Sequence, residues 1–285
     1  MEESGESDIA GYDIPAVETW ISDKIEALSP PFKWTRLEGG HSNLTYQIED
    51  TQGRLAVNRR PPKGELLHKA HDIGREWRLI SALFDTDVPV PEPLGFCESP
   101  DITGAWFYVM GCVDGHPLYG VEDAEMYVPP ENRVATGDSF IDVLAALHDL
   151  APEALGLSDL GKHDSYIGRQ LKTWYRSWTA SIEHAEYDDR RAHEFQEYFL
   201  AKMPEQGPIR VVHGDYGLHN TLIGKDGRVA AVVDWEISTL GDPLADLGYA
   251  LNQWSEPGDV IIGSPGGATT VGGFALKQYL IERYA

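Results

Sequence analysis

The sequence predicts an α+β protein in which a small region of strands precedes a larger, mainly helical region. Between residues 34 and 110, short apolar or β-branched segments alternate with turns that contain glycine, proline or aspartate. Beyond residue 133, apolar side chains recur at helical spacing over long stretches. The chain has 285 residues, of which 42% are apolar, so it can build one large or two modest domains with a real core.

The first region combines strands with two amphipathic helices. A helix is predicted over residues 14–28, because Val17, Ile21, Ile25 and Leu28 fall near one face. Another is predicted over residues 70–84. The strands of this region are predicted over residues 34–37, 44–49, 55–59, 94–97 and 106–110.

The second region is dominated by helices. They are predicted over residues 133–150, 166–182, 192–203, 242–254 and 274–284. Residues 238–241 are predicted to form a loop, and the glycine-rich residues 256–273 a mobile segment. Trp174, Tyr175 and Trp178 form an aromatic stripe on one of these helices, which is typical of a core but also suits the lining of an acceptor pocket.

The composition excludes several classes of function. The formal net charge is -23, which disfavours binding to nucleic acid or to an anionic membrane. A cationic substrate would suit this charge, although a solvated acidic surface is the simpler interpretation. No apolar run reaches the roughly 18 residues of a membrane-spanning helix, and the acidic N-terminus does not resemble a signal peptide. A cytoplasmic location is therefore expected, while the oligomeric state is left unknown. The two cysteines are too few for a disulfide framework.

The densest group of chemically useful side chains lies between residues 209 and 248. An apolar run leads into His213-Gly214-Asp215, and Asn220 follows. Residues 221–223 and 229–233 are predicted to form a hairpin, because Asp226-Gly227 between them favours a tight turn. A hairpin brings its two ends together, so Asn220 and Asp234 should converge beside Asp215.

This convergence suggests a magnesium site next to a general base. Mg²⁺ prefers oxygen ligands and usually binds one or two carboxylates together with substrate phosphates. Asn220 and Asp234 would supply such ligands. Asp215 is then free to take a proton from an alcohol. A metal-dependent hydrolase that uses His213, Asp215, Asp234 and Asp246 is an alternative, although the hairpin spacing fits it poorly.

These motifs resemble those of the aminoglycoside phosphotransferase family. The segments HGDYGLHN and VVDWE match its catalytic loop and metal-binding segment at His213, Gly214, Asp215, Asn220, Asp234, Trp235 and Glu236, and GDPLADLGY is also similar. More narrowly, the chain resembles the branch that includes kinase domains fused to acyl-CoA dehydrogenases. The resemblance implies a two-lobed, protein-kinase-like fold, with an N-lobe over residues 1–112 and a C-lobe over residues 113–285. It also implies further C-terminal helices, so either a C-terminally shortened chain or a different tail is expected.

The resemblance assigns the nucleotide site to the N-lobe. Ser42 and Asn43 would lie over the phosphates, in the turn that contains Gly39-Gly40. The hinge after the last N-lobe strand, with Met110 and Cys112, would bind adenine through backbone groups. ATP or GTP and Mg²⁺ are the expected cofactors.

One position departs from the pattern of the family. The lysine that usually contacts the α- and β-phosphates is absent, and Arg59 is matched to it, with Arg60 as the competing candidate. Glu76 is matched to the acid that pairs with this cation. The substitution matters because guanidinium is a planar fork, whereas ammonium is a point charge.

The predicted function is ATP-dependent transfer of the γ-phosphoryl group to a hydroxyl of a small molecule, with Asp215 as the catalytic base. His213 is expected to order the loop, and Asp246 to brace it. The acceptor is open among an aminoglycoside, a hydroxyacyl-CoA and a small metabolite alcohol. The missing lysine also motivates a second interpretation, a non-catalytic nucleotide-binding pseudokinase.

Overall fold

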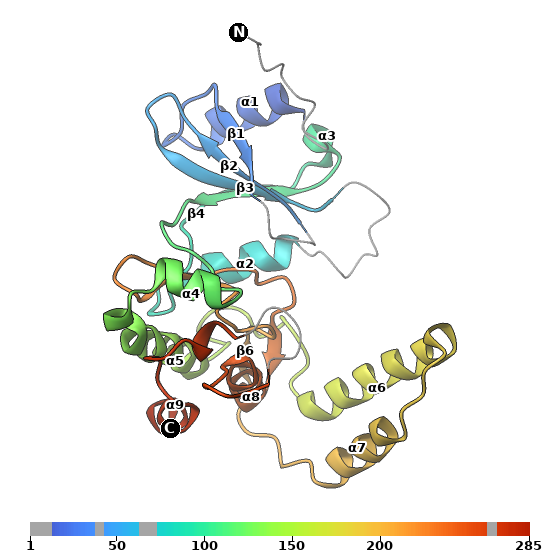
Figure 1. Ribbon diagram of the computed structural model, residues 1–285. Helices are drawn as coiled ribbons and strands as arrows, with labels where there is room; N and C mark the ends of the chain where they lie inside the picture. The colour runs from blue at the N-terminus through green and yellow to red at the C-terminus, as the bar shows by residue number, and fades with distance from the viewer. Residues whose placement is uncertain (1–12, 38–42, 63–72, 261–266) are drawn as a thin grey trace.

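A computed structural model describes residues 13–37, 43–62, 73–260 and 267–285. Within them, an antiparallel sheet dominates the first part of the chain, drawn at the top of Figure 1. Its strand order is β1-β2-β3-β5-β4. The strands are β1 (Lys33–Arg36), β2 (Leu44–Glu49), β3 (Leu55–Arg60), β4 (Pro93–Cys97) and β5 (Phe107–Gly111). A hairpin turn between β2 and β3 is closed by Asp50, whose Oδ1 accepts from the backbone N–H groups of Gln52 and Arg54, each at 2.8 Å.

Helices cover both faces of this sheet. Side chains alternate between the faces of a strand, so Phe107 and Val109 pack with helix α1 (Ile14–Lys24), whereas Tyr108 and Met110 pack with helix α2 (Ile73–Leu83). The short helix α3 (Pro100–Thr103) connects β4 to β5. Its N-cap is Ser99, which accepts from the N–H of Asp101, and Gly104 ends it with a φ of 78°.

The second part is mainly helical, and its small strands carry the motifs. Its helices are α4 (Val121–Tyr127), α5 (Arg133–Asp149), α6 (Tyr166–Ala185), α7 (Arg190–Ala201), α8 (Pro243–Gln253) and α9 (Lys277–Tyr284), with 3-10 turns η1 (Pro130–Asn132) and η2 (Ala268–Thr270). Its strands β6 (Arg210–Val212) and β9 (Thr239–Gly241) form one antiparallel pair, and β7 (Thr221–Ile223) and β8 (Val229–Val232) form another. Helices α6 and α7 project together from the rest of the molecule (Figure 1).

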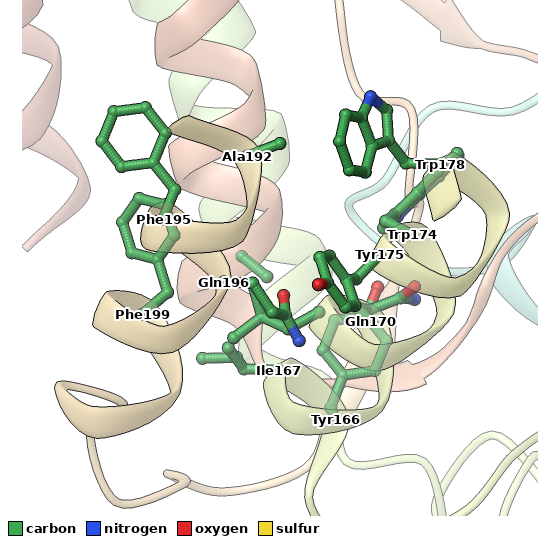
Figure 2. A pocket seen from close by; sticks show the side chains of 12 residues that line it. Tyr166, Ile167, Gln170, Trp174, Tyr175, Trp178, Ala192, Phe195, Gln196 and Phe199 are labelled. Carbon is green, nitrogen blue, oxygen red and sulfur yellow. The ribbon is translucent and has the colours of Figure 1, made fainter. Parts of the chain in front are cut away.

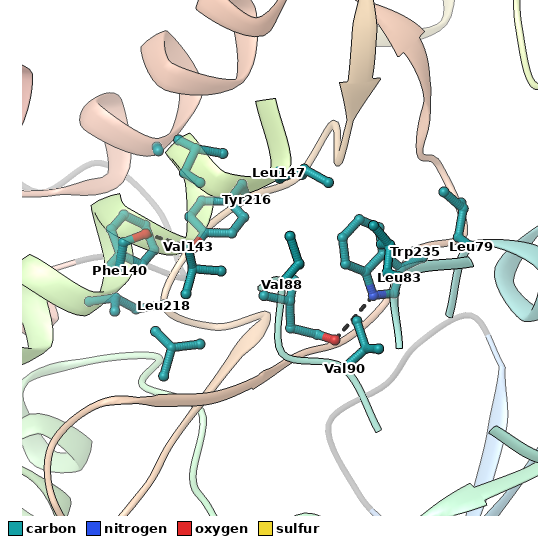
Figure 3. Packing of buried hydrophobic residues seen from close by; sticks show 14 of the residues in the cluster. Leu79, Leu83, Val88, Val90, Phe140, Val143, Leu147, Tyr216, Leu218 and Trp235 are labelled. Carbon is teal, nitrogen blue, oxygen red and sulfur yellow. Dashed lines mark hydrogen bonds between the residues drawn. The ribbon is translucent and has the colours of Figure 1, made fainter. Parts of the chain in front are cut away.

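One hydrophobic core connects the two parts. Figure 3 shows Leu79 and Leu83 of α2 beside Trp235, with Tyr216 and Phe140 further along the same cluster. Trp235 is fully buried, and its ring N–H donates to the carbonyl of Val232 at 3.1 Å. Burial of one large aromatic side chain contributes on the order of 2–3 kcal/mol.

Arg75 of α2 strengthens this connection. Its guanidinium donates to the carbonyls of Leu160 and Ser238, each at 2.9 Å. Helix α2 is therefore held against the mainly helical part, which fixes the side chains on α2 relative to the motifs.

The structure confirms the predicted fold class, and it corrects several details. The sequence predicts a loop over residues 238–241, but Thr239–Gly241 form strand β9, which pairs with β6 through Val211 and Leu240. The first helix ends at Lys24 rather than at residue 28, because the chain turns there and Leu28 N–H donates to Ile25 O at 3.0 Å. The last helix begins at Lys277, after the extended Leu276, rather than at residue 274.

Among the described residues, two helices lie outside the sequence prediction. They are the short α3 and α4, whose lengths give little periodic signal. None of the helices in the described part of the chain is long and apolar enough to cross a bilayer. The lobe boundary after residue 112 stays a prediction, although β5 ends at Gly111.

Candidate active site

The β7–β8 hairpin brings Asn220 and Asp234 to one end, as predicted from its turn. Thr221 pairs with Val232, and the N–H of Val233 donates to the carbonyl of Asn220 at 3.0 Å. Gly227 occupies the turn with a φ of 78°, which glycine adopts at little cost. Asp234 itself has a positive φ of 66°, an unusual value for a residue other than glycine.

Helix α5 anchors this hairpin. The hydroxyl of Thr136 donates to the carbonyl of Gly227 at 2.6 Å, and the N–H of Val229 donates to the Ser139 hydroxyl at 2.9 Å. Both contacts are buried. The positions of Asn220 and Asp234 are therefore set by a rigid helix as well as by the hairpin.

Asp215 lies in the loop between β6 and β7, with both carboxylate oxygens engaged. Asn220 Nδ2 donates to Oδ2 at 2.9 Å, and His219 Nε2 lies 3.3 Å from the same oxygen. The Tyr249 hydroxyl donates to Oδ1. Burial alone would raise the pKa of Asp215, but the hydrogen bonds from His219 and Tyr249 outweigh it and hold this pKa below its ordinary value. Asp215 is therefore ionised near neutral pH, as a general base must be.

The loop that carries Asp215 is braced by Asp246 on helix α8. The carboxylate of Asp246 accepts from the backbone N–H groups of His213 at 2.5 Å and Gly214 at 2.8 Å. The buried hydroxyl of Ser238 donates to the carbonyl of His213 at 2.9 Å. These contacts agree with the bracing role expected for Asp246.

His213 is buried and linked to backbone groups. Its Nε2 lies 3.0 Å from the carbonyl of Val233, so this nitrogen carries the proton, and Nδ1 accepts from the N–H of Asp215 at 3.3 Å. Burial lowers the pKa of His213, although Asp246 opposes the shift. A neutral histidine with both nitrogens occupied suits an ordering role rather than proton transfer.

Arg59 connects the sheet to the segment that carries Asp234. Its Nε lies 3.0 Å from Oε2 of Glu76, and its Nη2 lies 2.7 Å from Oδ1 of Asp234. Burial is the main cause that raises the pKa of Glu76 to about 7; the charge of Arg59 opposes this shift, and the negative charges of Asp234 and Glu236 add to it. The arrangement thus places more acidic than basic groups around one guanidinium.

Arg60 faces the other side of β3. Its Nε donates to the carbonyl of Pro61 and its Nη1 to the carbonyl of Thr103, each at 2.9 Å. Neighbouring residues of a strand point to opposite faces, and of these two arginines it is Arg59 that contacts Glu76 and Asp234. The geometry favours Arg59 over Arg60 as the counterpart of the usual lysine.

The remaining predicted nucleotide contacts are only partly brought together. Asn43 is buried, and its Nδ2 donates to Oε2 of Glu236 at 3.1 Å, while its Oδ1 has no hydrogen-bond partner among the described residues. Ser42 lies outside the described residues. Met110 is packed in the core, and Cys112 Sγ accepts from Gln47 at 3.3 Å. The hinge roles of Met110 and Cys112 therefore depend on their backbone groups and stay predictions.

The residues around Asp234 fit a magnesium ion that is bound together with phosphates. Asp234 is partly exposed, and Asn220 lies at the same end of the hairpin. In the described part of the chain, no group of three or more histidine, cysteine or acidic side chains is arranged to hold a metal on its own. Mg²⁺ does not require such a group, because phosphate oxygens and water complete its shell.

Sequence reasoning missed Tyr249 and His219. Tyr249 follows Asp246 by one helical turn on α8, and this spacing places both side chains toward the same loop. His219 follows Asp215 by four positions and contacts it. Both residues lie in or beside the motif segments, so their spacing from Asp246 and Asp215 could have identified them as neighbours of the candidate site.

A cavity of about 330 Å³ lies between α6 and α7. Figure 2 shows Trp174, Tyr175 and Trp178 of α6 on one side and Phe195 and Phe199 of α7 on the other. None of the described residues that line it is charged. Ala245 of α8 also lines the cavity, which places it next to the helix that carries Asp246 and Tyr249.

Comparison with known proteins identifies the family to which the chain belongs. The model of the phosphotransferase enzyme family matches residues 33–268. Rat acyl-CoA dehydrogenase family member 11 is 33% identical over 244 residues, which cover 84% of this chain and 31% of that protein. Human acyl-CoA dehydrogenase family member 11 is 29% identical over 296 residues, which cover 99% of this chain and 37% of that protein. The chain thus spans about a third of the length of these two relatives.

A solved structure of similar shape is that of a provisionally named aminoglycoside phosphotransferase from Ralstonia eutropha. It has a TM-score of 0.78 and 30% identity, and the match covers 96% of this chain and 79% of that chain.

Proposed function

Because the chain belongs to the phosphotransferase enzyme family, we propose that it transfers the γ-phosphoryl group of ATP to a hydroxyl of a small molecule. The observation that carries this proposal is the position of Asp215. It is an ionised carboxylate held by Asn220 at 2.9 Å, at the end of the hairpin that also presents Asp234. GTP in place of ATP would use the same groups.

Each of these residues has a distinct proposed role. Asp215 orients the acceptor hydroxyl and accepts its proton as the oxygen attacks phosphorus. Asn220 and Asp234 hold Mg²⁺, which would neutralise charge on the phosphates. Arg59, supported by Glu76, positions those phosphates. Asn43 and the backbone near Met110 and Cys112 complete the nucleotide site, together with Ser42.

Arg59 must change partners in this scheme. Its guanidinium contacts Asp234 at 2.7 Å in the structure. When a magnesium ion and phosphate are bound, Asp234 would bind the cation and Arg59 would bind phosphate oxygens, in place of their contact with each other. The planar fork of arginine would retain Glu76 through Nε while its Nη2 turns to phosphate.

The cavity between α6 and α7 supports an acceptor with an apolar part. Its described lining contains tryptophan, tyrosine and phenylalanine side chains and no carboxylate. A polycationic aminoglycoside would need acidic partners there. A hydroxyacyl-CoA is therefore the second candidate acceptor, which also suits the similarity to acyl-CoA dehydrogenase family members.

The test is nucleoside diphosphate release with Mg²⁺ and ATP or GTP, against a panel of hydroxyacyl-CoAs, amino alcohols and aminoglycosides. Asp215→Ala should lower acceptor-stimulated kcat by about 10²–10⁴, the usual contribution of a general base. Asp138→Ala is the matched control, because Asp138 also accepts a tyrosine hydroxyl, from Tyr279 at 2.9 Å.

The outcomes separate the alternatives. Stimulated release that is lost in Asp215→Ala and kept in Asp138→Ala establishes the kinase and identifies its acceptor class. Nucleotide binding without release under any acceptor would favour the pseudokinase. Hydrolysis of a substrate without nucleotide would favour the metal-dependent hydrolase.

A further inference from the structure

The hydroxyl of Tyr249 occupies one oxygen of the proposed base. Asp215 Oδ2 is taken by Asn220 at 2.9 Å and by His219 at 3.3 Å, whereas Oδ1 accepts from Tyr249. A hydroxyl that gives its proton to Asp215 must hydrogen bond to one of these oxygens. Oδ1 already accepts a hydrogen bond from a hydroxyl, which is the kind of donor that the acceptor would present.

Tyr249 is also placed to meet an incoming molecule. The residue is 36% exposed. It lies one helical turn after Ala245 on α8, so the two residues share a face of that helix, and Ala245 lines the cavity between α6 and α7. The cavity and the tyrosine hydroxyl therefore adjoin the same helix face.

We propose that Tyr249 is a positioning residue that holds Asp215 when no acceptor is bound, keeps water away from Oδ1, and gives up this place to the acceptor hydroxyl. The proposal rests on the proposed phosphotransferase function. It deepens that function by naming the residue that prevents unproductive use of the nucleotide.

The unproductive reaction is hydrolysis. A water on Oδ1 would give its proton to Asp215 while its oxygen forms a bond to the γ-phosphorus. The bond between that phosphorus and the β–γ bridging oxygen would break, and the products would be nucleoside diphosphate and inorganic phosphate. A tyrosine hydroxyl in the place of this water blocks the reaction, because the phenol is tied to α8 and need not approach the γ-phosphate.

Tyr249→Phe tests the proposal, because it removes only the hydroxyl. Basal hydrolysis of Mg²⁺-ATP or Mg²⁺-GTP without acceptor should rise by about tenfold, the factor that corresponds to the net contribution of one hydrogen bond. The ratio of hydrolysis to transfer should rise with it, and the KM of the acceptor should fall, because no internal hydroxyl competes. A merely structural role would lower hydrolysis and transfer alike and leave their ratio unchanged.

Two control variants accompany this measurement. Tyr279→Phe removes a hydrogen bond to another aspartate, Asp138, from a tyrosine that is 41% exposed, and it should leave the hydrolysis rate unchanged. Tyr249→Phe combined with Asp215→Asn should lose the added hydrolysis, because the water then has no base.

Several results would overturn the proposal. One is basal hydrolysis that stays equal or falls in Tyr249→Phe while nucleotide binding is intact. Another is phosphate on Tyr249 of the unaltered protein after incubation with Mg²⁺-ATP, detected by mass spectrometry, since the tyrosine would then be an acceptor.

Crystal structures separate a failure of this proposal from a failure of the proposed function. A water on Oδ1 in Tyr249→Phe, at the place of the hydroxyl in the unaltered protein, would support the positioning role even if no nucleotide bound. A Tyr249 hydroxyl turned away from Asp215 would overturn it. Failure of the proposed function would instead appear as no acceptor-stimulated transfer in the unaltered protein.

Discussion

Arg59 compensates the charge of the buried Glu76 on helix α2, and Arg59→Met tests how much this compensation stabilises the protein. The side chain of Arg59 is 10% exposed, and that of Glu76 is 1% exposed, with 3.0 Å between Nε and Oε2. Methionine keeps an unbranched apolar side chain but removes every donor. Removal of one partner from a buried ion pair costs about 3–5 kcal/mol, because the other charge stays buried without compensation. The free energy of unfolding should therefore fall by about 3–5 kcal/mol at pH 8.

The cost should depend on pH in a defined direction. Burial raises the pKa of Glu76 from 4.5 to about 7 in the folded protein, while Arg59 opposes this shift. Without Arg59 the folded pKa rises further, whereas the unfolded value stays near 4.5. The folded state then holds a proton that the unfolded chain releases, so stability decreases as the pH rises from about 4.5 through the folded pKa. Arg59→Met should therefore lower the free energy of unfolding less at pH 5 than at pH 8. At pH 8 the buried Glu76 must either carry an uncompensated charge or take up a proton from a solution that holds few.

The free energy of unfolding of the unaltered protein and of Arg59→Met is measured at pH 5 and pH 8 by urea denaturation, with tryptophan fluorescence as the signal. The double variant Arg59→Met with Glu76→Met should recover most of the loss, because no charge is then buried. Arg190→Met is the exposed control: its pair with Glu194 has side chains 87% and 55% exposed, and its loss should cost less than about 1 kcal/mol. A loss below about 1 kcal/mol for Arg59→Met, or no recovery in the double variant, would refute the reasoning.

Two further predictions concern the metal site and the hairpin. Asp234→Ala should weaken nucleotide binding by about tenfold or more with Mg²⁺ present, since it removes a charged contact, and by clearly less in EDTA; equal losses in titration calorimetry would argue against a ligand role. Gly227→Ala should destabilise the protein by more than the roughly 1–2 kcal/mol that a positive φ costs, because a Cβ at φ 78° would lie 2.6 Å from Cβ of Asn132. Gly53→Ala has the same φ of 78° with nothing within 4 Å, so it isolates the backbone cost, and equal losses in thermal unfolding of the two variants would contradict the predicted clash.

Turns, strands and helices that depend on residues close together in the chain can be predicted from the sequence. The Asp226-Gly227 turn predicts the hairpin, and the hairpin brings Asn220 and Asp234 together, because antiparallel pairing across a short turn is a local interaction. The strands of the sheet and most helices follow from side-chain periodicity in the same way. Local patterns in the sequence therefore suffice for the fold class and for the central members of the candidate site.

Strand β9 shows where local information ends. Its three residues, Thr239–Gly241, have no periodic pattern of their own. They are extended because the backbone of β6 lies beside them, with Val211 opposite Leu240. Pairing between segments so far apart in the chain is a tertiary interaction, so the sequence pattern predicts a loop.

The same limit separates the residues of the candidate site. Alternation along β3 determines that Arg59 and Arg60 face opposite ways, but only the packing of α2 decides which face meets Glu76. Tyr249 reaches Asp215 because Asp246, on the same helix, holds the loop that carries Asp215 against α8. The sequence by itself thus determined which groups could do chemistry. The tertiary structure decided which of them meet, because contacts between distant segments depend on how whole elements pack.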